Sequence, residues 1–256
     1  MKTAILTGAS SGLGKEMAKS IPIYFREVEE IWLIARRKER LEELAESIEK
    51  AYPGVCAVPL CLDLSASDFP HIMKGILEEK NPELVLLINC AGVGYLGSFD
   101  TSNGDEQQRM IDVNVSALTG MTHMCLPYMP NGGRIINISS IAAFAPNPRL
   151  SVYSATKHYV KALSCALNHE LRDRDITVTA VCPGPMATEF VDVGRISGRS
   201  RNFESLPYTD PSKAANTALR ASVLRKAVVT PGIFFKFARV LLKIIPSALA
   251  VRFTKV

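Results

Sequence analysis

The chain has 256 residues, of which 47% are hydrophobic and 21% are charged, and its net charge is +5. This balance excludes disordered, collagen-like and coiled-coil proteins, and it predicts one globular domain with a sizeable core. The charge is uneven, because residues 211–256 carry nine Lys or Arg side chains and no Asp or Glu.

Seven short apolar runs predict β-strands, and longer segments with helical periodicity separate them. We expect strands at Thr3–Thr7, Ile31–Ala35, Val55–Leu60, Leu84–Asn89, Arg134–Ile138, Thr177–Cys182 and Ala227–Thr230. Between the second and third runs, Arg37 to Ala51 has a helical apolar stripe. Near-continuously apolar strands that alternate with helices predict a doubly wound α/β domain, with a seven-stranded parallel sheet and helices on both faces. The polar stretch from Asp192 to Asp210 is the one long irregular candidate.

The first predicted strand runs directly into a glycine-rich turn that opens the first predicted helix. Its sequence is Thr7-Gly8-Ala9-Ser10-Ser11-Gly12-Leu13-Gly14. Glycines at this position let the backbone approach a pyrophosphate, which the free N–H groups and the positive end of the helix then hold. No Lys-Ser/Thr pair follows Gly14, which disfavours a nucleotide-hydrolysing P-loop. The alternative is a purely structural turn.

Arg36 and Arg37 follow the second predicted strand, where an acidic residue would bind the ribose hydroxyls of NAD. Arginine at that place instead pairs with the 2′-phosphate of NADP. We therefore expect NADP(H) as the cofactor. The alternative is that both arginines are only the solvated start of the next helix.

Tyr153 and Lys157 are four residues apart at the start of a predicted helix, so their side chains share one face. A nearby cation favours the phenolate form of a tyrosine, which makes the pair suitable for proton transfer at neutral pH. Ser140, at the carboxyl end of the fifth predicted strand, is placed to hydrogen-bond a substrate carbonyl. Chance spacing of the Tyr and Lys, and a serine that only caps the next segment, are the competing interpretations.

Seven motifs in this order make the chain resemble the short-chain dehydrogenase/reductase family, in its short single-domain branch, from residue 2 to about residue 230. The motifs are TGASSGLG (7–14), CLDLS (61–65), NCAG (89–92), VNV (113–115), INISS (136–140), YSATK (153–157) and PGPMAT (183–188). Cys90 stands where the family commonly has a second asparagine, a small departure. The resemblance implies a Rossmann-like fold.

The resemblance also implies a role for each matching residue. Tyr153 would be the general acid/base, Lys157 would bind the nicotinamide ribose and lower the tyrosine pKa, Ser140 would orient the substrate, and Asn114 would hold a proton-relay water. Asp63 would meet the adenine. The remaining cofactor contacts would come from the turn residues Gly8, Ser10, Ser11, Gly12, Leu13 and Gly14, from Asn89, Ala91 and Gly92, and from Pro183, Gly184, Met186 and Thr188 near the carboxamide.

These residues predict NADP(H)-dependent hydride transfer between the nicotinamide and a carbonyl or secondary alcohol, with a small apolar molecule as substrate. A nucleotide-sugar epimerase or dehydratase normally needs a larger second region than this chain has. A catalytically silent nucleotide-sensing or scaffold protein on the same fold is the rival outside enzymes. We expect a homodimer or homotetramer and no nucleic-acid partner.

The six cysteines and four histidines have no metal-ligand spacing, so we expect no metal site and reduced, mostly buried thiols. The chain begins on a strand-like segment, and its apolar runs are too short or too polar for a membrane span. The expected location is the cytoplasm.

Residues 1–232 form the predicted catalytic domain, and residues 233–256 form a C-terminal extension of it. Within Ile233 to Ile245, three basic side chains recur at helical spacing among apolar ones: Lys236, Arg239 and Lys243. Such a basic amphipathic helix suits peripheral contact with an anionic membrane. A dimer contact and a flap over an apolar substrate mouth are the alternatives.

Overall fold

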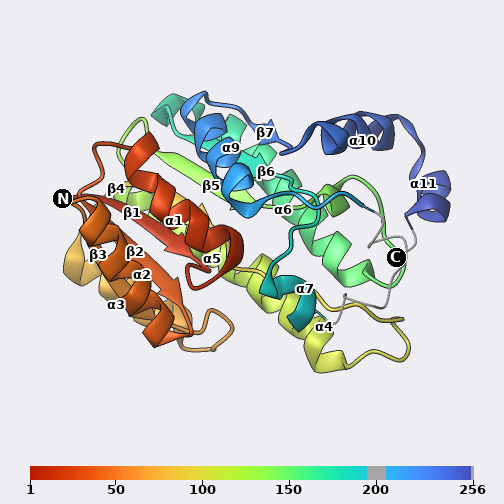
Figure 1. Ribbon diagram of the computed structural model, residues 1–256, viewed down its shortest axis with the longest axis horizontal. Helices are drawn as coiled ribbons and strands as arrows, with labels where there is room; N and C mark the ends of the chain where they lie inside the picture. Colours follow the sequence, from red (N-terminus) through yellow and green to blue (C-terminus); the bar gives the residue numbers. More distant parts are fainter. Residues whose placement is uncertain (195–205, 255–256) are drawn as a thin grey trace.

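A single parallel sheet organises the computed structural model, which describes residues 1–194 and 206–254. The strands are β1 (Lys2–Thr7), β2 (Glu30–Ala35), β3 (Cys56–Cys61), β4 (Glu83–Asn89), β5 (Arg134–Ile138), β6 (Thr177–Val181) and β7 (Val228–Val229), in the order β3-β2-β1-β4-β5-β6-β7 (Figure 1). All seven predicted strands are confirmed, with no end displaced by more than one residue.

Helices cover both faces of this sheet. They are α1 (Gly12–Tyr24), α2 (Lys38–Ala51), α3 (Phe69–Lys80), α4 (Gly104–Ile111), α5 (Leu118–Cys125), α6 (Ser151–Glu170), α7 (Glu189–Val193), α9 (Pro211–Val223), α10 (Ile233–Ile244) and α11 (Ser247–Phe253). A π-helical turn, Asp112–Ala117, joins α4 to α5. Of the predicted irregular stretch, residues 195–205 lie outside the described residues. The predicted doubly wound α/β fold is confirmed.

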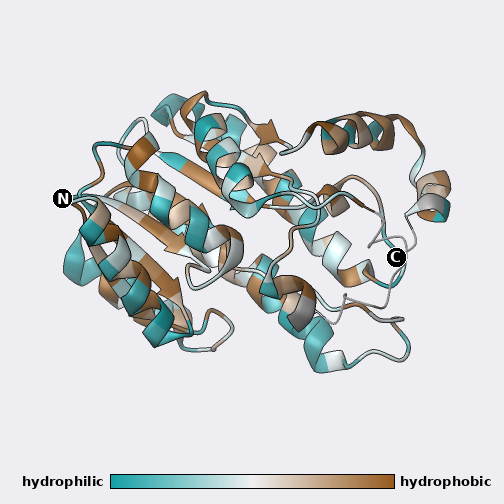
Figure 2. Cartoon of the chain, viewed as in Figure 1, coloured by the Kyte–Doolittle hydropathy of each residue, from teal (hydrophilic) through white to brown (hydrophobic). Residues whose placement is uncertain are grey.

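The two last helices, α10 and α11, lie at the opposite end of the molecule from β3 and α2 (Figure 1). Figure 2 shows α10 as predominantly hydrophobic, although Phe235 is its one buried side chain. Within residues 1–194 and 206–254, no helix is long and apolar enough to cross a bilayer.

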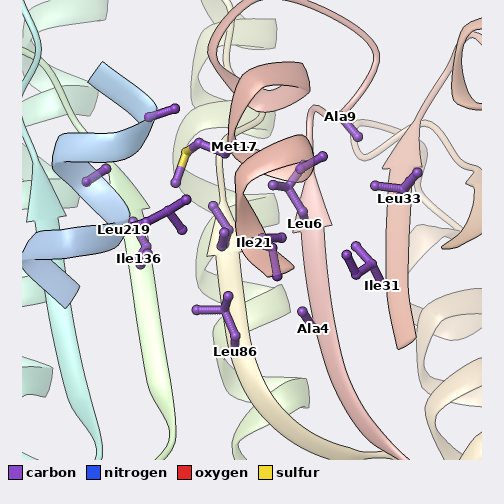
Figure 3. Close-up of a cluster of buried hydrophobic side chains, with 14 of the residues drawn as sticks. Ala4, Leu6, Ala9, Met17, Ile21, Ile31, Leu33, Leu86, Ile136 and Leu219 are labelled. Atoms are coloured by element: carbon purple, nitrogen blue, oxygen red, sulfur yellow. The ribbon is translucent and has the colours of Figure 1, made fainter. Parts of the chain in front are cut away.

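The core consists of two apolar layers, one on each face of the sheet. Successive residues of a strand point to opposite faces, so Ala4 and Leu6 pack beneath α1, α2 and α9 (Figure 3), whereas Ile5 packs toward α3 and α5. Met17 and Leu219 bring α1 and α9 into the first layer (Figure 3). This burial on both faces explains why the strands are apolar at nearly every position.

The expectation of mostly buried thiols is wrong for half of the cysteines. Cys125 and Cys182 are buried and Cys90 is partly buried, but Cys56, Cys61 and Cys165 are exposed. Cys56 and Cys61 begin and end β3, which is an edge strand, and Cys165 lies on the outer side of α6. No two of the six cysteines are joined by a disulfide in the structure.

The strand order reverses direction between β1 and β4, because β1 continues to β2 and β3 on one side while β4 to β7 follow on the other. At such a switch point the loops leave the carboxyl ends of neighbouring strands in opposite directions and open a crevice. The motifs at residues 7–14, 61–65, 89–92, 136–140 and 183–188 follow strands at this edge of the sheet, whereas Asn114 lies in the π-helical turn and Tyr153 and Lys157 lie in α6.

Candidate active site

The glycine-rich turn after β1 is held in a conformation that excludes side chains. Gly8 has a φ of +73°, and a Cβ there would lie 2.8 Å from the Cα of Ala91. A Cβ on Gly14 would lie 2.1 Å from the carbonyl oxygen of Gly8. Thr7 Oγ1 accepts the backbone N–H groups of Cys90 and Ala91 at 3.1 and 3.2 Å, which joins this turn to the end of β4.

The amino end of α1 opens directly from that turn. Its N-cap, Ser11, makes no side-chain cap hydrogen bond, and the first turn holds no acidic residue. Unsatisfied N–H groups and the positive helix end together form an anion site. The glycine cradle and this helix end therefore fit the pyrophosphate of a dinucleotide.

The two arginines after β2 differ in their surroundings. Arg37 donates to Ser10 Oγ at 3.0 and 3.2 Å and pairs with Glu189 at 2.6 Å. Arg36 is exposed beside Asp63. Glu189, at the start of α7, also pairs with Arg40 at 2.6 Å. The sequence did not indicate that Glu189 contacts Arg37, a residue expected to bind the 2′-phosphate.

Asp63, which we expect to meet the adenine, lines the same crevice. Its carboxylate accepts the N–H and hydroxyl of Ser65 at 3.0 and 2.7 Å and pairs with Arg109 at 3.5 Å. Burial alone would raise the pKa of Asp63, but the Ser65 hydrogen bonds and the Arg36 and Arg109 charges outweigh it and hold this pKa below its usual value. The carboxylate is thus ionised at neutral pH and able to accept a hydrogen bond.

Tyr153 and Lys157 stand on one face of α6, as the spacing predicts. The Nζ of Lys157 is 5.7 Å from the centroid of the Tyr153 ring and donates to the carbonyl of Ile138 at 2.9 Å. Only 4% of Lys157 is exposed, and this burial lowers its pKa to about 8, against the opposing influence of the Cys90 and Cys182 thiols.

The pKa of Tyr153 differs from the expectation. Burial raises it to about 12, although a hydrogen bond with Ser140 lowers it in part. The expected lowering by Lys157 does not appear in the chain alone, because loss of hydration dominates when no cofactor charge is nearby. Tyr153 is consequently a neutral proton donor at pH 7.

Ser140 has two contacts: it caps the next segment, as one interpretation expects, and it hydrogen-bonds Tyr153, while the expected substrate contact stays a prediction. Its Oγ accepts the N–H of Ala142 at 3.1 Å, which caps the short 3₁₀ turn Ile141–Ala143, and its hydroxyl also hydrogen-bonds Tyr153. The neighbouring Ser139 donates to the carbonyl of Lys157 at 2.8 Å. These bonds fix the end of β5 against α6.

Asn114 lies in the π-helical turn, behind Gly92. Its amide accepts the N–H of Val93 at 2.9 Å and donates to the Val93 carbonyl at 2.8 Å and to Thr156 at 3.1 Å. A Cβ on Gly92 would lie 3.2 Å from Asn114 Oδ1 and 3.3 Å from Lys157 Nζ. The side chain of Asn114 therefore ties three segments together, while the expected water contact stays a prediction.

A cavity of about 600 Å³ joins these parts. The predicted residues that line it are Gly8, Ser10, Ser11, Gly12, Leu13, Gly14, Arg36, Arg37, Asp63, Ala91, Gly92, Ser140, Tyr153, Lys157, Pro183, Gly184, Met186 and Thr188. Asn89 does not line it: this side chain is buried below the wall and donates to Thr122 and Asn137. Asn114 is also set back from the cavity.

One end of the cavity has an apolar wall that the motifs did not predict. Its members share an aliphatic or aromatic side chain and come from α7, α10 and the segment before α6: Leu150, Phe190, Val191, Phe234, Phe235, Ala238, Leu241 and Leu242. The ring of Phe190 is 5.7 Å from that of Tyr153, and Phe235 packs where a Cβ on Gly184 would lie, 2.2 Å from Cε2. The amphipathic pattern of residues 233–245 was the one available signal.

Comparison with known proteins agrees with this geometry. The model of the short chain dehydrogenase family matches residues 2–195. The chain belongs to this family. Among the described residues of this dehydrogenase, no group of three His, Cys, Asp or Glu side chains is arranged to hold a metal ion.

Similar family members include enzymes and solved structures of nearly the same length. The chain is 35% identical over 240 residues to the NADP-dependent 3-hydroxy acid dehydrogenase of Schizosaccharomyces pombe, with 89% of each chain covered. A short-chain dehydrogenase from Sphingobium yanoikuyae, solved in complex with NADPH, superposes with a TM-score of 0.80 at 29% identity, covering 97% of both chains. The bulky-bulky ketone specific alcohol dehydrogenase of Comamonas testosteroni superposes with a TM-score of 0.75 at 26% identity, covering 97% of this chain and 96% of that one. The protein is an oxidoreductase that uses a nicotinamide cofactor.

Proposed function

We propose that the protein is an NADP(H)-dependent oxidoreductase that interconverts an apolar carbonyl compound and its secondary alcohol. The observation that carries this proposal is that Tyr153, Ser140 and Lys157 face the same cavity as the glycine turn and two arginines. The relative that is NADP-dependent and the neighbour solved with NADPH support the choice of cofactor.

The residues of the chain divide the work of holding the cofactor. The N–H groups of the turn and of α1 would hold the pyrophosphate, Arg36 and Arg37 the 2′-phosphate, and Lys157 the nicotinamide ribose. When bound, the nicotinamide donates or accepts the hydride. Asp63 would accept a hydrogen bond from the adenine.

The proton transfer belongs to the side chains around Tyr153. Ser140 donates a hydrogen bond to the substrate carbonyl and so stabilises the negative charge that develops on its oxygen. Tyr153 gives its proton to that oxygen during reduction and takes it back during oxidation. Oxidation requires the phenolate, which burial opposes, so the positive charges of Lys157 and of the oxidised cofactor would be needed to lower the pKa of Tyr153.

The substrate end of the cavity favours an apolar molecule. Its wall is formed by aliphatic and aromatic side chains from α7 and α10, including Phe190 beside the ring of Tyr153. Apolar pockets with a few converging polar groups are typical of small-molecule sites. Ser140, Tyr153 and Lys157 supply the polar groups at the reacting end, and the apolar wall favours a largely hydrocarbon remainder of the substrate.

The test is Tyr153→Phe, assayed by NADPH consumption with ketones, aldehydes, sterols and acyl thioesters. We expect a loss of turnover of about 10²-fold or more with NADPH affinity nearly unchanged, because only the ionisable hydroxyl is removed. Tyr159→Phe is the matched control, since that phenol lies on α6 as well but bonds Thr119 at 3.0 Å, away from the cavity. Near-wild-type turnover by Tyr153→Phe would refute the acid/base role, and NADPH binding without turnover of any compound would favour the silent scaffold.

A further inference from the structure

Helix α10 presents an apolar face that no described residue covers. Six of its side chains are exposed hydrophobics, from Phe234 at 51% to Ile244 at 76%: Ile233, Phe234, Phe237, Val240, Leu241 and Ile244. At 100° per residue they fall within a sector of roughly 120°. We call these six residues the α10 face. Exposed apolar patches of this kind mark interaction surfaces.

The opposite side of the helix is packed and holds α10 in a defined orientation. Phe235 is 3% exposed and lies against Gly184. Arg239 donates to the carbonyl of Val228 at 3.4 Å, and its guanidinium stands 5.5 Å from the centre of the Phe144 ring. The α10 face therefore lies on the side of the helix opposite these contacts. Figure 2 shows α10 as a largely brown helix at one end of the molecule.

Basic side chains occupy the flank between these two sides. Lys236 and Lys243 fall there on the helical repeat, and both are exposed. Arg252 of α11 is exposed nearby in the sequence, and the whole segment 211–256 contains no acidic residue. A partner surface that complements this arrangement has an apolar region to meet the α10 face and negative charges beside it to meet the lysines.

This charge pattern favours a lipid surface over a second copy of the chain. In a two-fold symmetric dimer the same patch faces itself, so the cations flanking the α10 face would be brought together without an acidic residue of this segment to pair with them. Lipid phosphates supply the missing negative charge, and acyl chains accept the apolar sector.

The α10 face also continues into the cavity. Phe234 and Leu241 are exposed members of the face and line the cavity as well. We propose that α10 lies in the interface of an anionic membrane, with its apolar face toward the acyl chains, and that the substrate mouth opens toward the lipid. The second part rests on the proposed function, because it requires an apolar substrate; docking itself does not.

Docking is tested by sedimentation of the full chain with vesicles of phosphatidylcholine alone and of phosphatidylcholine mixed with phosphatidylserine. We expect binding to the mixed vesicles that weakens as salt is added. The double variant Phe237→Ser with Ile244→Ser should bind about ten-fold more weakly or worse, since both side chains are more than 70% exposed. The variant Lys236→Gln with Lys243→Gln should lose the preference for phosphatidylserine.

The matched control replaces the same two residue types elsewhere on the surface. Phe99→Ser with Ile23→Ser removes a phenylalanine that is 68% exposed and an isoleucine that is 52% exposed, both away from α10, and it should bind as the wild type does. The proposal is overturned if the full chain ignores both vesicles, or if the Phe237 and Ile244 variant binds equally well. It is also overturned if light scattering without lipid finds a dimer that this variant dissociates.

A second readout separates docking from catalysis. With a water-soluble aldehyde, the Phe237 and Ile244 variant should keep wild-type turnover, while with a long-chain ketone dissolved in the vesicles its turnover should fall in step with its binding. Equal turnover of the vesicle-borne ketone by variant and wild type would overturn the entry route. If no compound is turned over at all, the proposed function fails, and the sedimentation result still decides the docking.

Discussion

The two ends of the cavity are constructed in different ways. At the cofactor end, backbone segments pack directly against each other. A Cβ on Gly8 would collide with the main chain of Ala91, and a Cβ on Gly14 would collide with the main chain of Gly8. At the substrate end, side chain meets side chain, as in the contact of Phe190 with Tyr153. A surface made of backbone tolerates no substituent, whereas one made of side chains can be reshaped by exchanging them. We therefore expect cofactor binding to depend on the glycine turn and substrate specificity to be set by the side chains at the other end.

Gly14→Ala tests the rigid end and should have the largest effect. The new Cβ would lie 2.1 Å from the Gly8 carbonyl oxygen, so the turn must shift; we expect a destabilisation of about 3 kcal/mol and loss of NADPH binding. Gly75→Ala is the control, because a Cβ there has no neighbour within 4 Å and helix propensity favours alanine by up to about 1 kcal/mol. Thermal unfolding and NADPH fluorescence titration measure both. Unchanged affinity in Gly14→Ala would break the comparison.

Lys157→Met tests how far burial removes water from the ammonium group of Lys157. The pKa of Lys157 is about 8 in the folded chain, against 10.5 ordinarily, so the unfolded chain binds more protons between these values. The contribution of this group to the free energy of unfolding therefore rises with pH across that window, by about 3 kcal/mol in total. In urea unfolding, the free energy of unfolding of the wild type minus that of the variant should rise between about pH 8 and about pH 10.5. A difference independent of pH would mean that the ammonium is well hydrated.

Arg36→Asp tests cofactor choice at the adenosine edge. It removes a phosphate partner and supplies a ribose acceptor, so NADPH should weaken by about ten-fold or more while NADH binding improves. Arg26→Asp, an exposed arginine between α1 and β2, gives the same charge change as a control. A wild type that already prefers NADH, or retention of NADPH affinity after removal of both Arg36 and Arg37, would contradict the assignment.

Glu189→Gln tests the contact that links the two ends. Glu189 belongs to α7 and engages Arg37 and Arg40 from across the crevice; hydrogen bonds from these arginines hold its pKa below the usual value. Because this pair is solvent-exposed, freeing Arg37 should tighten NADPH binding only about two- to five-fold and leave NADH unchanged. Glu16→Gln, which breaks the exposed pair with Lys19, is the control. Equal effects on NADPH and NADH binding would show that Glu189 does not compete with the 2′-phosphate for Arg37.

The sequence was most informative where backbone geometry restricts the residue type. The central strands are buried on both faces and hence almost uniformly apolar, and the glycines of the first turn leave no room for a side chain. Both could therefore be found without the structure. The Tyr153–Lys157 spacing is likewise set by the helical repeat. By contrast, Asn89 looks like a cleft residue in its motif, yet its amide points inward to Thr122 and Asn137.

Contacts between segments far apart in the chain were not predictable. Nothing in the residues around Glu189 indicates that it reaches Arg37, 152 positions away. Phe235 resembles its neighbours in α10, and only the packing on Gly184 distinguishes it. The exposure of Cys165 depends on which side of α6 meets the sheet. The rise in the pKa of Tyr153 that burial causes was likewise not predictable, because the cost of dehydration depends on the depth at which the ring lies.

Helix α10, which forms part of the substrate wall, buries one side chain, Phe235. We therefore expect this helix to detach locally at a lower free energy than that of unfolding the domain. Detaching α10 exposes little apolar surface beyond that ring, whereas separating the strands would expose both core layers, so the helix can leave and return while the sheet stays intact. We expect its amide hydrogens to exchange with solvent much faster than those of β1 or β4. Bulky molecules would then enter while α10 is transiently detached, and the free energy of this opening would not depend on the free energy of unfolding of the whole domain.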